Sequence, residues 1–502
     1  MRSVLMIIGL FMITGTYVLT SAEAPNAGDR LVAMQSADDP SVSFRIWFKV
    51  GSQDDPKGKE GLAALTAAML SEGGTVSRSY EQILEALFPM ASSYGCNAST
   101  EMMVFTGRVH KDNLDAYYNL FIDQLLNPAF PQDVFDRLKQ NMLNYLTTTL
   151  KYASDEELGK AVLYESIFDK TPYGHLTSGT VSGLHAITLQ DVKDFYTTYF
   201  NRNNFVIGIA GGYSDDFLKV LQTDLQKLND GKENVTEKVV PAAFEGYHVT
   251  IAEKAANATA ISFGFPITVV RGSREWYALA IANSWLGEHR NSSSHLYQVI
   301  REERGLNYGD YSYIEHFPNG SRRQMPPVNV ARKQHIFEVW IRPVPNETRH
   351  FALRAAMREL DALINTGMSE ADFKLTKGFL KNYVLHYAPD TYTRLGYALD
   401  DVFYGIKEGH ISLYRKMMDE ITLEEVNAAI KKHLSMERFH IAVVTNNAEE
   451  FKNALVNNSV SSITYSTPKP DEVLQEDKDI EVYKLPIRSE NVRIIPVEKL
   501  FQ

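Results

Sequence analysis

The sequence predicts an α+β fold of two homologous domains, each a mainly antiparallel sheet covered by helices. The first observation is an internal repeat. Ile187–Val192 (ITLQDV) and Phe205–Ile209 (FVIGI) recur 234 positions later as Ile421–Val426 (ITLEEV) and Phe439–Val443 (FHIAV). The second is a polar stretch, 229–238, between the two copies. The third is a hydrophobic content of 44% over 502 residues, enough for more than one packed core.

Each repeat unit has the same order of elements: a helix capped by threonine, an apolar strand, a loop, and a helix with acids in its first turn. We therefore divide the chain into four parts. These are a signal peptide over 1–24, an N-terminal domain over 25–238, a C-terminal domain over 239–467 and a C-terminal tail over 468–502. The tail is charged and poor in apolar residues at helical spacing, so we expect it to be extended along the body or partly disordered.

The N-terminus predicts an exported protein, periplasmic or extracellular. Arg2 precedes an apolar run at 4–13, and Ala22-Glu23-Ala24 before Pro25 is typical of a signal-peptide cleavage site. An uncleaved signal anchor is the alternative, but no later stretch is long and apolar enough to span a membrane. A single cysteine, Cys96, suits a bacterial periplasm, and the net charge of −11 argues against nucleic acid as a partner.

One helical segment carries alanine where a metallopeptidase carries its catalytic residues. In the inverted zincin pattern H-x-x-E-H, two histidines one helical turn apart bind zinc, and the glutamate acts as general base. In the segment 61–69 (GLAALTAAM) these places fall on Ala64, Ala67 and Ala68. A methyl group has no lone pair and no titratable proton, so this degenerate motif can neither hold a metal nor activate water.

The surroundings of these alanines resemble the insulinase/pitrilysin (M16) metallopeptidase family. The landmarks are collinear along the chain: 48–75 (FKVGSQDDPKGKEGLAALTAAMLSEGGT), 97–100 (NAST), 171–174 (TPYG), 179–180 (GT) and 300–308 (IREERGLNY). The resemblance implies a third zinc ligand, a glutamate, on a later helix. The corresponding stretch, 141–149, contains no acid, and Glu156 and Glu157 lie about two helical turns or more beyond it. Glu72 lies on the same helix face as Ala64 and Ala68, but one carboxylate does not make a zinc site, and we interpret it as a solvated or helix-end charge. Because all of the zinc ligands are missing, we expect this chain to bind no cofactor.

Arg301 and Tyr308 are the residues for which the resemblance implies a function. The spacing predicts a helix over 294–304 that ends at Gly305, with an extended segment beginning at 306. In the family, an arginine and a tyrosine at this spacing reach toward the substrate carbonyl, where a cation and a hydroxyl donor stabilise developing negative charge. The alternative is an ordinary helix end with surface ion pairs and a half-buried tyrosine.

Two further segments leave alternatives open. The segment 97–109 reads as one strand, either an edge strand at which Asn97 helps to bind an extended peptide or an internal strand. The loop 316–334 carries Arg322, Arg323, Arg332 and Lys333, and a solvated hairpin insertion is favoured over a contact with an acidic partner. No histidines are spaced i, i+4, and the serines at 292–294 lack the pattern of a nucleophile elbow.

These features favour a non-catalytic subunit of a zinc metallopeptidase. The resemblance implies that the two domains form half of a clamshell, so that the chain would supply half of a peptide-binding chamber and grip the substrate through Arg301 and Tyr308. A homologous partner bearing H-x-x-E-H would supply the zinc and the general base. This chain would be no enzyme alone, but it would contribute to metalloendopeptidase activity in a heterodimer. A scaffold or peptide-binding protein without a role in proteolysis is the alternative, and an independent hydrolase with a relocated site is a third hypothesis.

Overall fold

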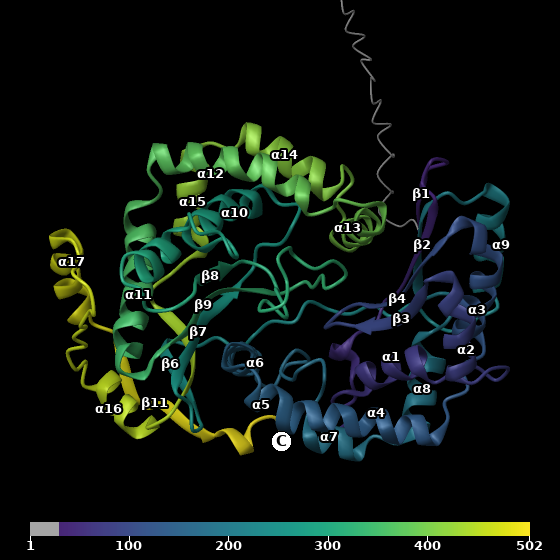
Figure 1. Ribbon diagram of the computed structural model, residues 1–502, viewed down its shortest axis with the longest axis horizontal. Coiled ribbons are helices and arrows are strands. Elements are labelled where there is room, and N and C mark those ends of the chain that lie inside the picture. The colour runs from purple at the N-terminus through teal and green to yellow at the C-terminus, as the bar shows by residue number, and fades with distance from the viewer. Residues whose placement is uncertain (1–29) are drawn as a thin grey trace, which may run out of the picture.

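The computed structural model describes residues 30–502, which form two α+β halves lying side by side (Figure 1). The predicted signal peptide, 1–24, lies outside the described residues. Among the helices of residues 30–502, none combines the length and the apolar composition needed to cross a membrane.

The N-terminal half contains a five-stranded sheet in the order β1-β5-β2-β4-β3. β1 pairs with β5 in parallel, and the remaining pairs are antiparallel. Its strands are β1 (Leu31–Gln35), β2 (Ser41–Phe48), β3 (Ser93–Ala98), β4 (Met103–His110) and β5 (Phe205–Gly211).

The C-terminal half contains a six-stranded sheet in the order β11-β6-β10-β7-β9-β8. β6 runs parallel to β10 and β11, and the other pairs are antiparallel. Its strands are β6 (Gly246–Glu253), β7 (Ala258–Ile267), β8 (Asp310–Tyr313), β9 (His335–Pro345), β10 (Arg438–Thr445) and β11 (Ile487–Pro496). The predicted α+β class with two similar, mainly antiparallel units is confirmed.

Helices pack on these sheets and complete one large apolar core in each half. The helices of the first half are α1 (Leu62–Glu72), α2 (Tyr80–Leu87), α3 (Leu114–Leu126), α4 (Gln132–Asn144), α5 (Leu150–Tyr152), α6 (Asp155–Ile167), α7 (Val181–Ala186), α8 (Leu189–Tyr199) and α9 (Asp215–Leu225). Those of the second half are α10 (Arg274–Gly287), α11 (Arg349–Thr366), α12 (Glu370–Tyr383), α13 (Thr391–Tyr404), α14 (His410–Glu420), α15 (Leu423–His433), α16 (Ala448–Val456) and α17 (Asp471–Glu481).

The internal repeat appears in the structure as repeated elements. α8 and α15 both begin after a threonine that forms a capping box, Thr188 with Asp191 and Thr422 with Glu425. Each is followed by a buried strand, β5 or β10, and then by a helix with two acids in its first turn, α9 or α16. Local capping and periodicity were therefore sufficient to predict this part of each half.

One helix of each half packs on the sheet of the other half. The sequence did not predict these contacts. α6 packs on β7, β10 and β9 of the C-terminal sheet, while α13 packs on β5, β2 and β1 of the N-terminal sheet. The face of each sheet that is turned away from the helices of its own half is thus covered as well. This exchange places α6 and the loop before β9 between the two halves (Figure 1).

The C-terminal segment is folded rather than disordered. It forms α17, joins the second sheet as β11, and then returns to the N-terminal half. There Val497, Leu500 and Phe501 are buried in that half's core, and the Val181 amide donates to the Phe501 carbonyl at 2.9 Å. β11 is extended along the body, as one of the two expectations had it, whereas α17 and the buried end were not predicted because their apolar residues contact distant elements, which helical periodicity does not report.

Candidate functional site

The alanines of the degenerate motif lie on α1 and divide between a cavity and the core. The Asp55 carboxylate accepts hydrogen bonds from the Gly61 and Ala63 amides, both at 2.7 Å, and so fixes the start of this helix. Ala64 and Ala68 line a cavity of about 670 Å³. Ala67, at the place of the general base, is only 3% exposed and belongs to the apolar core.

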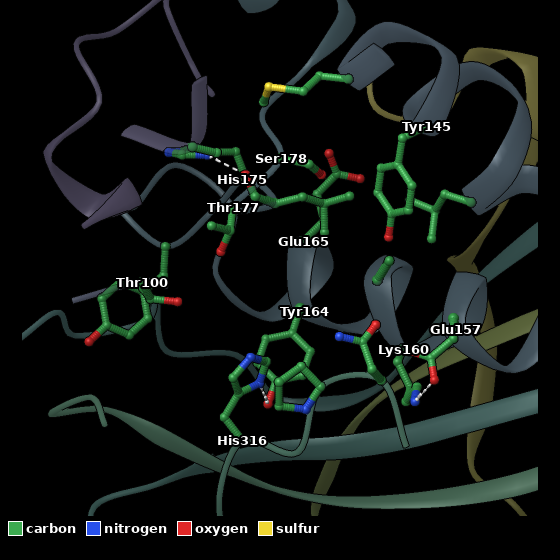
Figure 2. A pocket seen from close by; sticks show the side chains of 18 of the residues that line it. Thr100, Tyr145, Glu157, Lys160, Tyr164, Glu165, His175, Thr177, Ser178 and His316 are labelled. Carbon is green, nitrogen blue, oxygen red and sulfur yellow. Dashed lines mark hydrogen bonds and ion pairs between the residues drawn. The ribbon is translucent and has the colours of Figure 1, made fainter. Parts of the chain in front are cut away.

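The stretch expected to carry the third zinc ligand does face this cavity. Asn141, Met142 and Tyr145, at the end of α4 and in the π-helical turn that follows it, line the same space as Ala64 and Ala68. Figure 2 shows Tyr145 and Glu165 pointing into the cavity beside Thr177 and Ser178. Glu72, at the last position of α1, also lines the cavity, but it is an ion-pair partner of Arg137 at 2.8 Å.

The opposite wall comes from α6 and from the C-terminal half. Lys160 forms an ion pair with Glu157 at 2.6 Å, and its Nζ lies 3.6 Å from the centre of the Trp340 ring. Arg332 donates to the Tyr164 hydroxyl at 2.5 Å, and His316 Nδ1 lies 3.1 Å from the same oxygen (Figure 2). This wall therefore combines aromatic side chains with buried charges of both signs.

Two carboxyl groups of the cavity are strongly affected by burial. Desolvation raises the pKa of Glu338 on β9 to about 7, although Lys160 and Arg332 oppose the shift. Desolvation likewise raises the pKa of Glu165 to about 7. Glu338 Oε1 lies 3.5 Å from the Tyr164 hydroxyl, whereas no group among residues 30–502 donates to Glu338 Oε2.

These side chains do not fit a zinc ion. Zinc in proteins is held by nitrogen, sulfur or carboxylate oxygen in tetrahedral array, and the α1 face presents methyl groups instead. Within the described part of the chain, no three His, Cys, Asp or Glu side chains are grouped so that they could hold a metal. No step of peptide hydrolysis can therefore run through a metal held by Ala64, Ala67 and Ala68.

Arg301 and Tyr308 lie together on a different part of the molecule and do not line this cavity. Arg301 occupies the last turn of a π-helical segment, Tyr297–Glu302, and Gly305 closes the helix with φ +71°. The Arg301 guanidinium lies 5.9 Å from the centre of the Tyr308 ring. The predicted helix end is confirmed, but the helix is shorter than expected, and the following strand, β8, begins only at Asp310.

Both side chains are available for a ligand. The Tyr308 side chain lies at the surface, with the residue 77% exposed. Arg301 Nε is buried, yet no acceptor for it exists among the residues that the structure describes. The nearest carboxylate of Arg301, Glu302, is 3.9 Å from its Nη1. A half-buried packing role for Tyr308 is excluded by this exposure, whereas the predicted grip on a substrate stays a prediction.

Asn97 lies on β3, at one edge of the N-terminal sheet. The segment 97–109 is not one strand, because Ser99 turns the chain: its amide donates to the Met102 carbonyl at 2.7 Å, and β4 begins at Met103. The alternative of an internal strand is thus wrong for Asn97. Its side chain is exposed, and its role in binding a peptide stays a prediction.

The basic loop before β9 is only partly the solvated insertion that was expected. Arg322 and Arg323 are exposed, whereas Arg332 is 2% exposed and lies over the rings of Tyr164 and Phe168. Sequence reasoning missed Lys160, Tyr164, Glu338 and Arg332 as cavity residues. The lysine and the glutamates inside otherwise apolar helix and strand segments were the available signal, but nothing in the sequence links α6 to β9.

Comparisons with known proteins agree with this geometry. The family model of insulinase (peptidase family M16) matches residues 30–180, and that of the peptidase M16 inactive domain matches residues 186–380. A protein named uncharacterized zinc protease from Mycobacterium tuberculosis is 23% identical over 80% of this chain and 88% of its own length. The non-peptidase homolog YmxG from Helicobacter pylori is 24% identical over 89% of this chain and 98% of its own length.

Two further matches are more distant in sequence or shorter. The mitochondrial-processing peptidase subunit beta from Dictyostelium discoideum is 22% identical over 42% of this chain and 45% of its own length. A solved structure of a peptidase M16 inactive domain from Pseudomonas fluorescens superposes with a TM-score of 0.73 at 21% identity, covering 83% of this chain and 95% of that one. Both halves match the family's models in order, and the chain belongs to the M16 (insulinase) peptidase family as a member without the zinc-binding side chains.

Proposed function

We propose that this chain is the non-catalytic subunit of an M16-type zinc peptidase. The observation that carries the proposal is the separation of two surfaces within one chain. The α1 face offers methyl groups where zinc ligands would be needed, whereas the partly exposed Arg301 side chain and the exposed Tyr308 side chain form a donor pair. In this proposal the pair acts on a reacting carbonyl at the zinc site of another chain.

In this proposal a homologous subunit with an intact H-x-x-E-H motif holds zinc and the general base, and the two chains enclose the peptide. The guanidinium of Arg301 and the hydroxyl of Tyr308 would donate to the scissile carbonyl oxygen as it gains negative charge. The free edge of β3, with Asn97, would pair with an extended peptide through backbone hydrogen bonds. The name of the H. pylori relative, a non-peptidase homolog, supports a role without catalysis by this chain alone.

The predicted signal peptide places the assembly outside the cytoplasm in this proposal, in the periplasm or beyond. Respiratory scaffolding inside a cell is therefore disfavoured, although a scaffold in general is not. The mitochondrial-processing peptidase subunit among the relatives supports a division of labour between chains, since its name describes one subunit of a peptidase.

The test is reconstitution. The chain would be expressed with a homologous H-x-x-E-H subunit from the same organism, and peptide cleavage would be measured for each chain alone and for the purified mixture, with and without a zinc chelator. We expect cleavage only in the mixture and only with zinc. Cleavage by this chain alone would overturn the proposal. A stable complex whose activity is unaffected by Arg301→Ala and Tyr308→Phe would favour the scaffold.

A further inference from the structure

A second cavity lies away from the alanine face, where the segment that joins the two halves crosses the first sheet. It has a volume of about 440 Å³ and is bounded by β2, β5, α13 and the segment 233–236. We call it the linker cavity. Figure 1 shows α13 beside β2, one of the two strands that line the cavity. Neither the degenerate motif nor the Arg301–Tyr308 pair contributes to it.

One wall of the linker cavity is apolar and aromatic. Trp47 and Val206 project from β2 and β5, and Val402 and Phe403 project from α13. The rings of Trp47 and Phe403 are 5.8 Å apart and tilted by 48°. Such a surface is suited to the body of a small organic molecule, because pockets for such ligands are lined mainly by apolar and aromatic side chains.

The polar groups around this wall favour a negatively charged ligand. Trp47 is 5% exposed, and its indole Nε1 has no hydrogen-bond partner among residues 30–502, although a buried indole N–H normally finds one. An indole nitrogen can only donate, so its missing partner is an acceptor. The cations Arg30, Lys49 and Lys333 also line the cavity, against the two acids Glu101 and Glu233.

Lys333 is paired with Glu101 at 3.7 Å, so the capacity for a further anion lies with Lys49 and Arg30, which share Glu233. Glu101 is already occupied, since the Lys333 amide donates to it at 2.5 Å and the Tyr173 hydroxyl donates to it as well. Glu233 pairs with Lys49 and lies 3.6 Å from Arg30. Its carboxylate is 39% exposed, so it can move aside when another anion enters.

The segment that covers the cavity is held from both halves. Asn234 Nδ2 donates to the Lys49 carbonyl at 2.9 Å and to Asp54 Oδ1 at 3.0 Å, and Lys333 Nζ donates to the Thr236 carbonyl at 2.5 Å. The cover is therefore fixed by side chains on each side of the cavity. A ligand beneath it would contact the first half, the second half and the segment that joins them.

We propose that the linker cavity binds a small organic anion with an apolar, preferably aromatic, body. The body would lie against Trp47 and Phe403, an anionic oxygen would accept the indole N–H, and Lys49 with Arg30 would balance the charge. The inference is independent of the proposed peptidase role, because it needs no partner chain. It also needs no residue of the first cavity, the one lined by Ala64 and Ala68, which we call the alanine cavity.

The probe is 8-anilinonaphthalene-1-sulfonate, which has an aromatic body and one sulfonate, with neutral N-phenyl-1-naphthylamine as the comparison. Binding is measured on the isolated full chain as fluorescence and by calorimetry. We expect Trp47→Phe, which keeps the ring and removes the donor, to weaken sulfonate binding about tenfold. Trp285→Phe is the matched control at a tryptophan outside the cavity, and it should leave the dissociation constant unchanged.

Two charge variants should act in opposite directions. Lys49→Met should weaken binding of the sulfonate about threefold to fivefold, and Glu233→Gln should strengthen it by a similar factor, because it releases Lys49 and Arg30. Lys219→Met, at an exposed position of α9, is the matched control. Neither charge variant should change the binding of the neutral naphthylamine.

Val402→Trp, which fills the cavity, should abolish sulfonate binding in a protein whose melting curve is otherwise unchanged. If this variant does not fold, the Trp47, Lys49 and Glu233 variants still decide the question. Sulfonate binding that is equal in all of these variants, or no tighter than that of the neutral probe, would overturn the proposal.

Discussion

The alanine cavity and the Arg301–Tyr308 surface show what differs between a face that cannot perform zinc chemistry and one that could assist it. On α1 the motif side chains that line the cavity, Ala64 and Ala68, are methyl groups, and the charges opposite them are paired or buried. At the end of the π-helical segment, by contrast, a guanidinium and a phenol lie together at the surface with capacity to donate. The motif positions of α1 therefore offer no group that could hold zinc, whereas Arg301 and Tyr308 offer hydrogen-bond donors.

The largest expected effect concerns Glu338, a buried acid of the alanine cavity. The raised pKa of Glu338, about 7, exceeds the ordinary glutamate value of 4.5, so between these pH values the folded chain binds more protons than the unfolded chain. Stability is thus lost as pH rises through this window. Relative to Glu338→Gln, the wild type should lose about 3 kcal/mol of unfolding free energy between pH 4.5 and 8, measured by urea denaturation. A difference that is constant with pH would contradict this assignment.

The next effect concerns the Arg301–Tyr308 surface. In the reconstituted heterodimer, Arg301→Ala should lower kcat/KM about 100-fold, because one donor to the developing oxyanion is lost. Arg301 is a partly exposed residue with a long ion pair, so the unfolding free energy of the chain should change by less than about 1 kcal/mol.

Arg488→Ala, at an exposed position of β11, is the matched control for this experiment. It should leave both kcat/KM and stability unchanged. Equal activity of the Arg301 and Arg488 variants would remove the functional difference between the two surfaces.

A smaller effect separates the alanines from one another. Ala67→Glu places a carboxylate in a tightly packed part of the core and should lower the free energy of unfolding by about 2 kcal/mol. Ala68→Glu, which faces the cavity, should cost below about 1 kcal/mol. The two variants differ only by one position on α1, so equal losses in a urea titration would show that Ala67 is not in the core.

The smallest effect concerns Glu72. Its ion pair with Arg137 is partly exposed, so Glu72→Gln, Arg137→Ala and the double variant should give a coupling energy of about 0.5 kcal/mol in a double-mutant cycle. Zinc at equimolar concentration should not raise the melting temperature of the wild type or of any of these variants. A zinc-dependent rise that disappears with Glu72→Gln would reveal a metal site on this face.

Much of each half could be predicted because its signals are local. The threonine caps of α8 and α15, the buried strands after them and the acids of α9 and α16 are all specified within a few residues. The degenerate motif was equally readable, since the missing lone pairs of three alanines follow from their chemistry. The break between β3 and β4 was missed because a short polar turn within an otherwise strand-like run gives only a weak signal.

The sequence by itself determined that the chain has two similar α+β units, that its zinc motif carries no ligands, and that an arginine and a tyrosine flank a helix end. These conclusions depend on residue type and short-range spacing. Only the tertiary structure decided that α6 packs on the C-terminal sheet and α13 on the N-terminal sheet. It also decided that the last strand joins the second sheet, and that Arg332 and Glu338 line one cavity together with residues of α6. The physical reason is that such contacts join residues more than a hundred positions apart, and burial between distant elements leaves no periodic signal in the chain.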